Sequence, residues 1–105
     1  MRSPHDAERS MAAPETLGLD TRVEIRKAAI RLLEEMPEGV GRLVIDLAGT
    51  RHVDSAGLGA LMLIQRRAAE RRQVVVLRSA SEEIRFLLML TKLDDLFQLE
   101  STVSQ

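Results

Sequence analysis

The sequence predicts an α/β fold, with helices packed on a small mixed or parallel sheet. Helix-like and strand-like segments alternate from about residue 20 onwards, in the order helix, strand, helix, strand, helix, strand. The strand-like segments are short and mostly apolar, which is typical of interior strands of a parallel sheet. Because parallel neighbours need a connection that crosses the sheet, we expect right-handed crossovers between them.

Residues 1–16 differ in composition from the rest of the chain. They contain Pro4, Pro14, charged residues and alanines, but no Val, Ile or Phe. Such a segment can bury little apolar surface, so we expect a flexible N-terminal tail or at best one weak edge strand. The domain proper is therefore predicted to span residues 17–105.

The first helix is predicted to begin at Asp20 or Thr21. Both residue types cap helices, and Thr21 stands three residues before Glu24, which is the spacing of a capping box. A proline and two glycines within residues 37–41 end the helix. Apolar residues recur at steps of three and four along one face of this helix: Ile25, Ala28, Ala29, Leu32, Leu33 and Met36.

A buried strand, a loop and a second helix are expected next. The strand covers residues 43–47, which are apolar except for Asp46. The loop covers residues 48–53, and the helix runs from about residue 57 to residue 72. One side of this helix is predicted to bring together Leu58, Leu61, Met62, Gln65 and Ala69.

The remaining segments predict a strand, a helix and a last short strand. A β-branched run at residues 74–77 indicates another interior strand. Ser79 and Glu82 have the capping-box spacing and would open a helix that ends near Leu90. Residues 97–99 form the final strand. One side of the third helix is predicted to carry Ile84, Leu87, Leu88 and Thr91.

The third helix is apolar almost all round between Phe86 and Leu90. A helix of this kind is either deeply buried or offers an apolar patch to a partner. Because a sheet this small cannot cover the helix completely, we expect partial exposure and a contact with another protein.

Composition excludes several classes of protein. A chain of 105 residues forms one domain. Its net charge of −1 gives no attraction to nucleic acid or to an anionic membrane, and the absence of cysteine excludes disulfides and thiolate metal sites. No apolar stretch approaches the roughly 18–20 residues of a membrane span, and residues 1–14 lack the apolar core of a signal peptide. We therefore expect a cytoplasmic protein.

Asp54 and Ser55 lie in the turn before the second helix. Partner and ligand sites in open α/β sheets favour the carboxyl ends of strands. Gly57 and Gly59 lack Cβ atoms, so a partner's backbone or a phosphate can approach closely. A phosphate on Ser55 would be favoured by the N–H groups at the helix N-terminus. The simpler alternative is that Ser55 is an ordinary helix cap.

The order of these segments resembles the STAS domain, in particular the bacterial anti-sigma-factor-antagonist branch. The signature of that family is a hydrophobic strand ending in Asp-Leu, followed by Asp-Ser-[Ser/Thr/Ala]-Gly-Leu-Gly. This sequence has LVIDL at residues 43–47 and DSAGLG at residues 54–59. The LGLD at residues 17–20 resembles the family's Gly-x-Leu-Asp element. The resemblance covers about residues 17–100.

The resemblance implies a STAS-like fold and a regulatory role without enzymatic activity. Ser55 would be the phosphoacceptor of a GHKL-fold serine kinase that is also the anti-sigma factor, and a PP2C-type phosphatase would reset it. The unmodified domain would bind the anti-sigma factor and free the sigma factor. Ala56 replaces a frequent second hydroxyl. The implied partner surface consists of Asp20, Thr21, Asp54, Ser55, Ala56, Gly57 and Leu58.

Two departures from the family pattern affect the predicted sheet. The family begins with one or two strands before Gly-x-Leu-Asp, and residues 1–16 do not supply a convincing one. If this edge strand is missing, the strand at residues 43–47 is open to pairing with another chain, and a homodimer could form through the open edge. The family's C-terminal helix is absent or very short after Leu99.

Other sites have weaker support in the sequence. Asp20, Asp46 and Asp54 do not have the spacing of a metal cage, and Asp46 is expected to bond local backbone groups. His52 is expected to be a solvated loop residue rather than a base for Ser55. A solvated helix face is expected to carry a basic run: Arg66, Arg67, Arg71 and Arg72.

A second function remains open at the level of the sequence. The domain could be a constitutive STAS subunit of a larger assembly, such as the small cytoplasmic partner of a lipid-transport ABC ATPase. The same surface would then dock without a phosphorylation cycle. In that branch the acceptor position is commonly Thr, so Ser55 mildly favours the phospho-switch.

Overall fold

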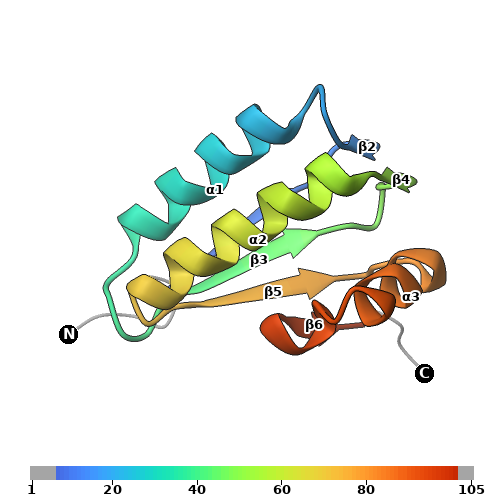
Figure 1. Ribbon diagram of the computed structural model, residues 1–105. Coiled ribbons are helices and arrows are strands. Elements are labelled where there is room, and N and C mark those ends of the chain that lie inside the picture. The colour runs from blue at the N-terminus through green and yellow to red at the C-terminus, as the bar shows by residue number, and fades with distance from the viewer. Residues whose placement is uncertain (1–6, 102–105) are drawn as a thin grey trace.

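The computed structural model describes residues 7–101 and has three helices on a four-stranded parallel sheet (Figure 1). The sheet has the order β1-β3-β5-β6, and every neighbouring pair is parallel. A separate two-stranded ladder joins β2 and β4. The elements are β1 (Glu8–Ala12), β2 (Thr16–Leu17), α1 (Arg22–Glu35), β3 (Arg42–Asp46), β4 (His52–Val53), α2 (Ser55–Glu70), β5 (Val74–Arg78), α3 (Glu82–Leu90), a 3₁₀ turn (Asp94–Leu96) and β6 (Gln98–Glu100).

The N-terminal edge strand is present at residues 8–12, where it replaces the alternative of a flexible tail. Strand β1 pairs with β3 along its whole length, from Glu8 opposite Arg42 to Ala12 opposite Asp46. Strand β3 is therefore interior, and the expectation that it forms an open edge is wrong. The sequence did not predict β1 because this strand lacks β-branched residues and is stabilised by pairing with a strand distant in the sequence. Residues 1–6 and 102–105, which include the rest of the predicted tail and of the chain end after Leu99, lie outside the described residues.

Helices α1 and α2 pack side by side over one face of the sheet (Figure 1). The predicted face of α1 is correct at Ile25, Ala29 and Leu33, which are buried. The predicted face of α2 is correct at Leu61, which is buried, and at Leu58, which packs partly buried against the core, but it is wrong at Met62 and Ala69, which are exposed. Residues 58–64 are apolar or small on every side, so their spacing does not fix the buried face. Packing against α1 and the sheet selects a neighbouring face, which carries Gly57, Ala60, Leu61, Ile64 and Ala68.

The first residues of α1 and α3 differ from the predicted capping boxes. Thr21 precedes α1 but makes no side-chain cap hydrogen bond. Helix α3 is capped by Ser81, whose hydroxyl accepts from the Ile84 amide at 3.1 Å. Ser79 has a positive φ of 62°, which places it in the turn after β5 and not at the helix start. A serine two residues later therefore serves the same purpose, since either can accept from an exposed amide.

The face of the sheet without helices carries a chain of ion pairs. Arg42 contacts Glu8 at 2.7 Å and Glu100 at 2.8 Å, and Arg78 contacts Glu100 as well. The hydrogen bonds from Arg78 and Arg42 lower the pKa of the Glu100 carboxyl. Val44 and Val76 pair with each other on this same face and are fully buried. The ion pairs thus tie β1, β3, β5 and β6 together across the sheet.

Candidate functional site

The β2–β4 ladder brings two distant loops together at one end of the molecule. Thr16 pairs with His52, and Leu17 pairs with Val53. Leu17 is fully buried, so it anchors the ladder to the core. Residues 48–53 were expected to be a loop, and their last two residues form this ladder instead. The consequence is that residues 18–20 lie directly beside the start of α2.

Asp54 is the cap of α2, so Ser55 is not. The Oδ1 atom of Asp54 accepts from the Gly57 amide at 2.9 Å, and its Oδ2 atom accepts from the Leu19 amide at 3.2 Å. These backbone hydrogen bonds, with a smaller contribution from the charge of Arg22, lower the pKa of the Asp54 carboxyl. One carboxylate therefore fixes both the start of α2 and the loop that precedes α1.

Two glycines permit this close approach of loop and helix. A Cβ atom on Gly57 would lie 2.0 Å from the carbonyl oxygen of Leu17, and one on Gly18 would lie 2.4 Å from Oδ2 of Asp54. The expected role of Gly57, to admit a partner, is therefore wrong: it is buried and admits the chain's own backbone. At Gly59 a Cβ would meet nothing within 4 Å, so that position does face open space.

Thr21 occupies the N-cap position of α1, but its hydroxyl supports the same loop instead of capping the helix. Its Oγ1 atom donates to the carbonyl oxygen of Thr16 at 2.8 Å and accepts from the Gly18 amide at 3.0 Å. A hydroxyl can do both at once, because it has one proton and two lone pairs. Thr21 thus belongs to the framework of the site.

Ser55 is exposed at the first position of α2. Its hydroxyl has no hydrogen-bond partner among residues 7–101, because Asp54 already serves the helix start. A shallow hollow between α1 and α2, which we call the Ser55 hollow, is lined by Ser55, Arg22, Arg26, Ala56, Gly59, Ala60 and Leu63.

The predicted partner surface is brought together at one end of the fold, but its members differ in accessibility. Asp20, Asp54 and Ser55 are exposed. Ala56 and Leu58 are half-buried, as is Thr21, and Gly57 is buried. Sequence analysis missed Arg22 and Arg26, which line the same hollow. Their i, i+4 spacing just after the Gly-x-Leu-Asp element could have indicated them.

The residues of the weaker candidate sites lie elsewhere. His52 is exposed and lines a different hollow, together with Glu83. Asp46 accepts from the Ala48 amide at 2.9 Å, which confirms its local role. Arg66, Arg67 and Arg72 are exposed, whereas Arg71 donates to the Met36 carbonyl oxygen at 3.0 Å and belongs to the structure. Within residues 7–101, no group of three or more His, Asp or Glu side chains is placed to hold a metal ion.

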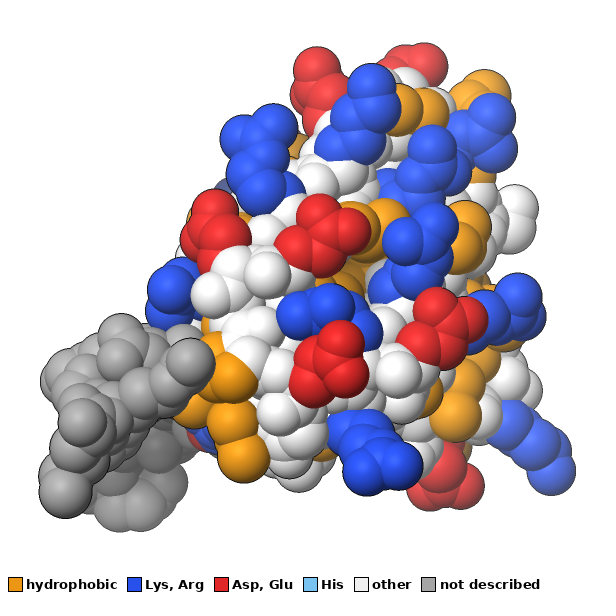
Figure 2. Space-filling view, turned by 90° about the vertical axis from the view of Figure 1, so that its left-hand side faces the viewer, with side chains coloured by type: hydrophobic (Ala, Val, Ile, Leu, Met, Phe, Trp, Pro, Cys, Tyr) orange, Lys and Arg blue, Asp and Glu red, His pale blue; other side chains and the backbone are white. Residues whose placement is uncertain are grey.

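The side of the molecule that carries α1 and α2 has charges of both signs. On the face drawn in Figure 2, Lys and Arg side chains lie among Asp and Glu side chains, with hydrophobic side chains between them. The exposed acidic residues of these two helices are Glu24, Glu34, Glu35 and Glu70. The exposed or half-buried basic residues of the first two helices are Arg22, Arg26, Lys27, Arg31, Arg66 and Arg67. A partner that meets this side therefore encounters charges of both signs.

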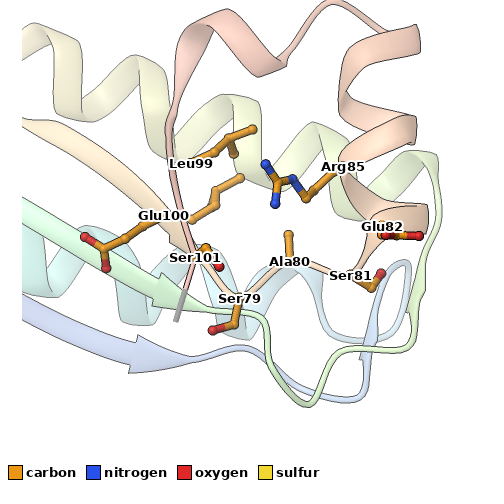
Figure 3. Close-up of a pocket in the computed structure, with 9 residues that line it drawn as sticks. Ser79, Ala80, Ser81, Glu82, Arg85, Leu99, Glu100 and Ser101 are labelled. Carbon is orange, nitrogen blue, oxygen red and sulfur yellow. The ribbon is translucent and has the colours of Figure 1, made fainter. Parts of the chain in front are cut away.

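A second exposed region lies where α3 meets β6. Phe86 is 55% exposed, Met89 54% and Leu90 63%, which confirms the predicted partial exposure of this helix. Ile84 and Leu88 point the other way, into the core. Close by, Arg85 extends into a hollow lined by Leu99, Glu100 and the turn at residues 79–81 (Figure 3). We call Phe86, Met89, Leu90, Leu96 and Leu99 the α3–β6 patch.

Comparison with known proteins gives a matching family model and matching solved structures. Residues 6–100 match the family model described as "Mlab, STAS domain". A protein of Thermotoga maritima proposed to be an anti-sigma factor antagonist is 21% identical, with 93% of this chain and 82% of that chain covered and a TM-score of 0.78. A sulfate transporter family protein of Wolinella succinogenes is 13% identical, with 90% and 76% covered and a TM-score of 0.76.

The unphosphorylated form of the anti-sigma factor antagonist SpoIIAA has the same architecture. It is 12% identical, with 99% of this chain and 86% of that chain covered and a TM-score of 0.69. At these identities the structural matches establish the fold and nothing further. Among residues 7–101, the helices fall short of the length and apolar character that crossing a membrane requires.

Proposed function

The chain belongs to the STAS domain family, and on that basis we propose that it is an anti-sigma factor antagonist switched by phosphorylation of Ser55. Unmodified, it binds an anti-sigma factor of the GHKL kinase fold in the bacterial cytoplasm, and so releases a sigma factor. The kinase transfers the γ-phosphoryl group of ATP to Oγ of Ser55, and the modified domain lets go. A PP2C-type phosphatase hydrolyses the phosphoserine and resets the cycle.

The observation that carries this proposal is the division of labour between Asp54 and Ser55. Asp54 makes the hydrogen bonds that start α2, and the exposed Ser55 hydroxyl makes none with the described residues. A phosphoryl group on Ser55 therefore breaks none of the hydrogen bonds among residues 7–101. Its added charge of about −1.5 to −2 acts on whatever docks against the surface. The switch then expels a partner without refolding the domain.

The test uses the full chain with a GHKL kinase from the same genome and ATP. We expect one added phosphate by intact mass, mapped to Ser55 by fragmentation, and none in Ser55→Ala. Ser101 is a suitable control position, because Ser101→Ala should leave the modification unchanged. The unmodified chain should bind the kinase, and the phosphorylated chain should not. Phosphate at another residue, or equal binding by both forms, would contradict the proposal.

A second candidate is a constitutive STAS subunit of a larger assembly, such as a lipid-transport ABC ATPase. The α3–β6 patch favours it, since permanent interfaces are more hydrophobic than transient ones. The family model and the solved structures support the STAS fold that both candidates share, so the matches do not separate the two candidates. Stable co-purification with an ATPase, unaffected by Ser55→Asp but lost with Phe86→Ser, would support this second candidate.

A further inference from the structure

We propose that Arg22 and Arg26 of α1 receive the phosphoryl group on Ser55, so that the chain itself holds its phosphorylated form. This inference rests on the proposed function, because it concerns the regulation of the same serine. In addition to the proposed switch, two guanidinium groups of the same chain would bind the phosphate.

The geometry brings the three side chains to one hollow. Arg22 and Arg26 are four residues apart on α1, so they lie one above the other on the same side of the helix. Both line the Ser55 hollow together with Ser55 from the neighbouring helix. The opposite wall is made by small residues, Ala56 and Gly59, and the space above Gly59 is open. A phosphoryl group therefore has room between the two helices.

Both arginines are available to a new anion. Within residues 7–101, neither guanidinium is held in a salt bridge, whereas Arg42, Arg71 and Arg78 each contact a glutamate. Arg22 acts on Asp54 through its charge alone. Arginine binds phosphate oxygens through paired, charge-assisted hydrogen bonds, which are about twice as strong as neutral ones. Two unpaired arginines beside the acceptor thus form a fitting receptor.

The other charged groups around Ser55 oppose this attraction only in part. The Asp54 carboxylate adjoins Ser55 but is bound to the amides of Gly57 and Leu19. Asp20 is exposed in the loop before α1. Glu24 lines a different hollow with Met11, on the side of α1 away from Ser55. Two cations therefore line the hollow that the phosphate would enter, and no carboxylate does.

The test places phosphoserine at position 55 of the full chain by genetic encoding, without a kinase. The pKa of the second phosphate ionisation is then measured by ³¹P NMR. We expect it to lie about half a unit or more below that of phosphoserine in a peptide of residues 52–58, because nearby cations favour the dianion. The difference should shrink as salt is added.

Paired substitutions show which cations are responsible. Arg22→Gln with Arg26→Gln should remove most of the lowering of the phosphate pKa; what remains comes from the N–H groups at the start of α2, because Asp54 is present in the peptide as well. Lys27→Gln with Arg31→Gln is the matched control: it removes the same charge, at the same spacing, from the same helix, and neither residue lines the hollow. The control should keep most of the lowered pKa. Each single substitution should give a partial effect, which covers the case that a double variant does not fold.

An equal pKa in the wild-type chain and the peptide would overturn the inference, as would equal shifts in the two paired variants. These outcomes are independent of the kinase and of any partner. If the pKa is lowered but no kinase modifies Ser55, the proposed function fails and the receptor stands. If a kinase modifies Ser55 but the pKa is not lowered, the receptor fails and the switch stands.

Discussion

The Ser55 end of the molecule and the α3–β6 patch are held by different kinds of interaction. At the Ser55 end, backbone atoms are in direct contact: Asp54 binds two amides, and Gly57 lies against the Leu17 carbonyl. At the α3–β6 patch, helix α3 is attached through apolar side chains such as Leu88, and its outer side chains face solvent.

This difference separates two ways of making a docking surface. A surface built on backbone contacts depends on the shape of every residue in it, so small substitutions are costly there. A surface built on exposed apolar side chains depends on their general character, so substitutions on it affect a partner more than the fold. The following predictions test that contrast, from the largest expected effect to the smallest.

Of all substitutions that add one methyl group, Gly57→Ala should lower the free energy of unfolding the most. Its Cβ would lie 2.0 Å from the oxygen and 2.6 Å from the carbon of the Leu17 carbonyl, and backbone cannot move aside cheaply. We expect a loss of more than about 4 kcal/mol in the free energy of unfolding, or no folding at all.

Gly59→Ala is the control, with open space around its Cβ. It should raise the free energy of unfolding by up to about 1 kcal/mol, because alanine favours helices. Urea titrations followed by circular dichroism compare the two.

Within α3, neighbouring residues should behave in opposite ways. Leu88 is fully buried, so Leu88→Ala should lower the free energy of unfolding by about 2–5 kcal/mol. Met89 is 54% exposed, so Met89→Ala should change it by less than about 0.5 kcal/mol. Chemical denaturation measures both. A large loss for Met89→Ala would mean that the α3–β6 patch is not a free surface in the isolated domain.

Asp54→Ala should lower the thermal midpoint and change its dependence on pH. The pKa of Asp54 is lowered in the folded chain, so its contribution to stability is complete above the unfolded pKa of about 4. That contribution is lost as the pH falls through the lower folded value. The difference between the wild type and Asp54→Ala should therefore begin to narrow below about pH 4. Asp54→Asn keeps the Oδ1 acceptor for Gly57 and should fall between them at neutral pH. Thermal melts from pH 2 to pH 7 test this; a constant difference would contradict it.

Ser55→Ala should be the mildest change. The Ser55 hydroxyl has no hydrogen-bond partner among the described residues, so its removal should alter the free energy of unfolding by less than about 0.5 kcal/mol. Calorimetry of the two chains gives the comparison. A larger loss would show that Ser55 contributes to the helix start and would weaken its assignment as a free acceptor.

The interior of the fold could be predicted from the sequence with small errors. The apolar runs placed β3 and β5 within one residue of their bounds, and the end of α3 at Leu90 was correct, although Ser81 and not Ser79 precedes its first turn. These segments have a strong apolar pattern of their own. Strand β1 does not: only pairing with β3 makes Glu8–Ala12 a strand, so local composition could not reveal it.

The sequence predicted where the candidate site lies, but not which residues make its contacts. The motif placed Asp54 and Ser55 at the start of α2, as observed. It did not show that Asp54 would take the cap, because that depends on the loop brought in by a ladder of only two residue pairs. The role of Gly57 was misjudged for the same reason. Arg22 and Arg26 were overlooked because their i, i+4 spacing shows only that they share one side of α1, whereas the packing of α1 beside α2 brings that side to Ser55.

An all-parallel sheet also sets an order of events during synthesis. No two neighbouring strands are joined by a hairpin, so each pairing must wait for a helix and a second strand to emerge from the ribosome. The Ser55 end needs only residues up to α2, whereas β6 is the last partner to arrive. We therefore expect the Ser55 end to form early on the nascent chain. The α3–β6 patch would then form last. Its apolar side chains would be exposed to chaperones while β6 is still unpaired.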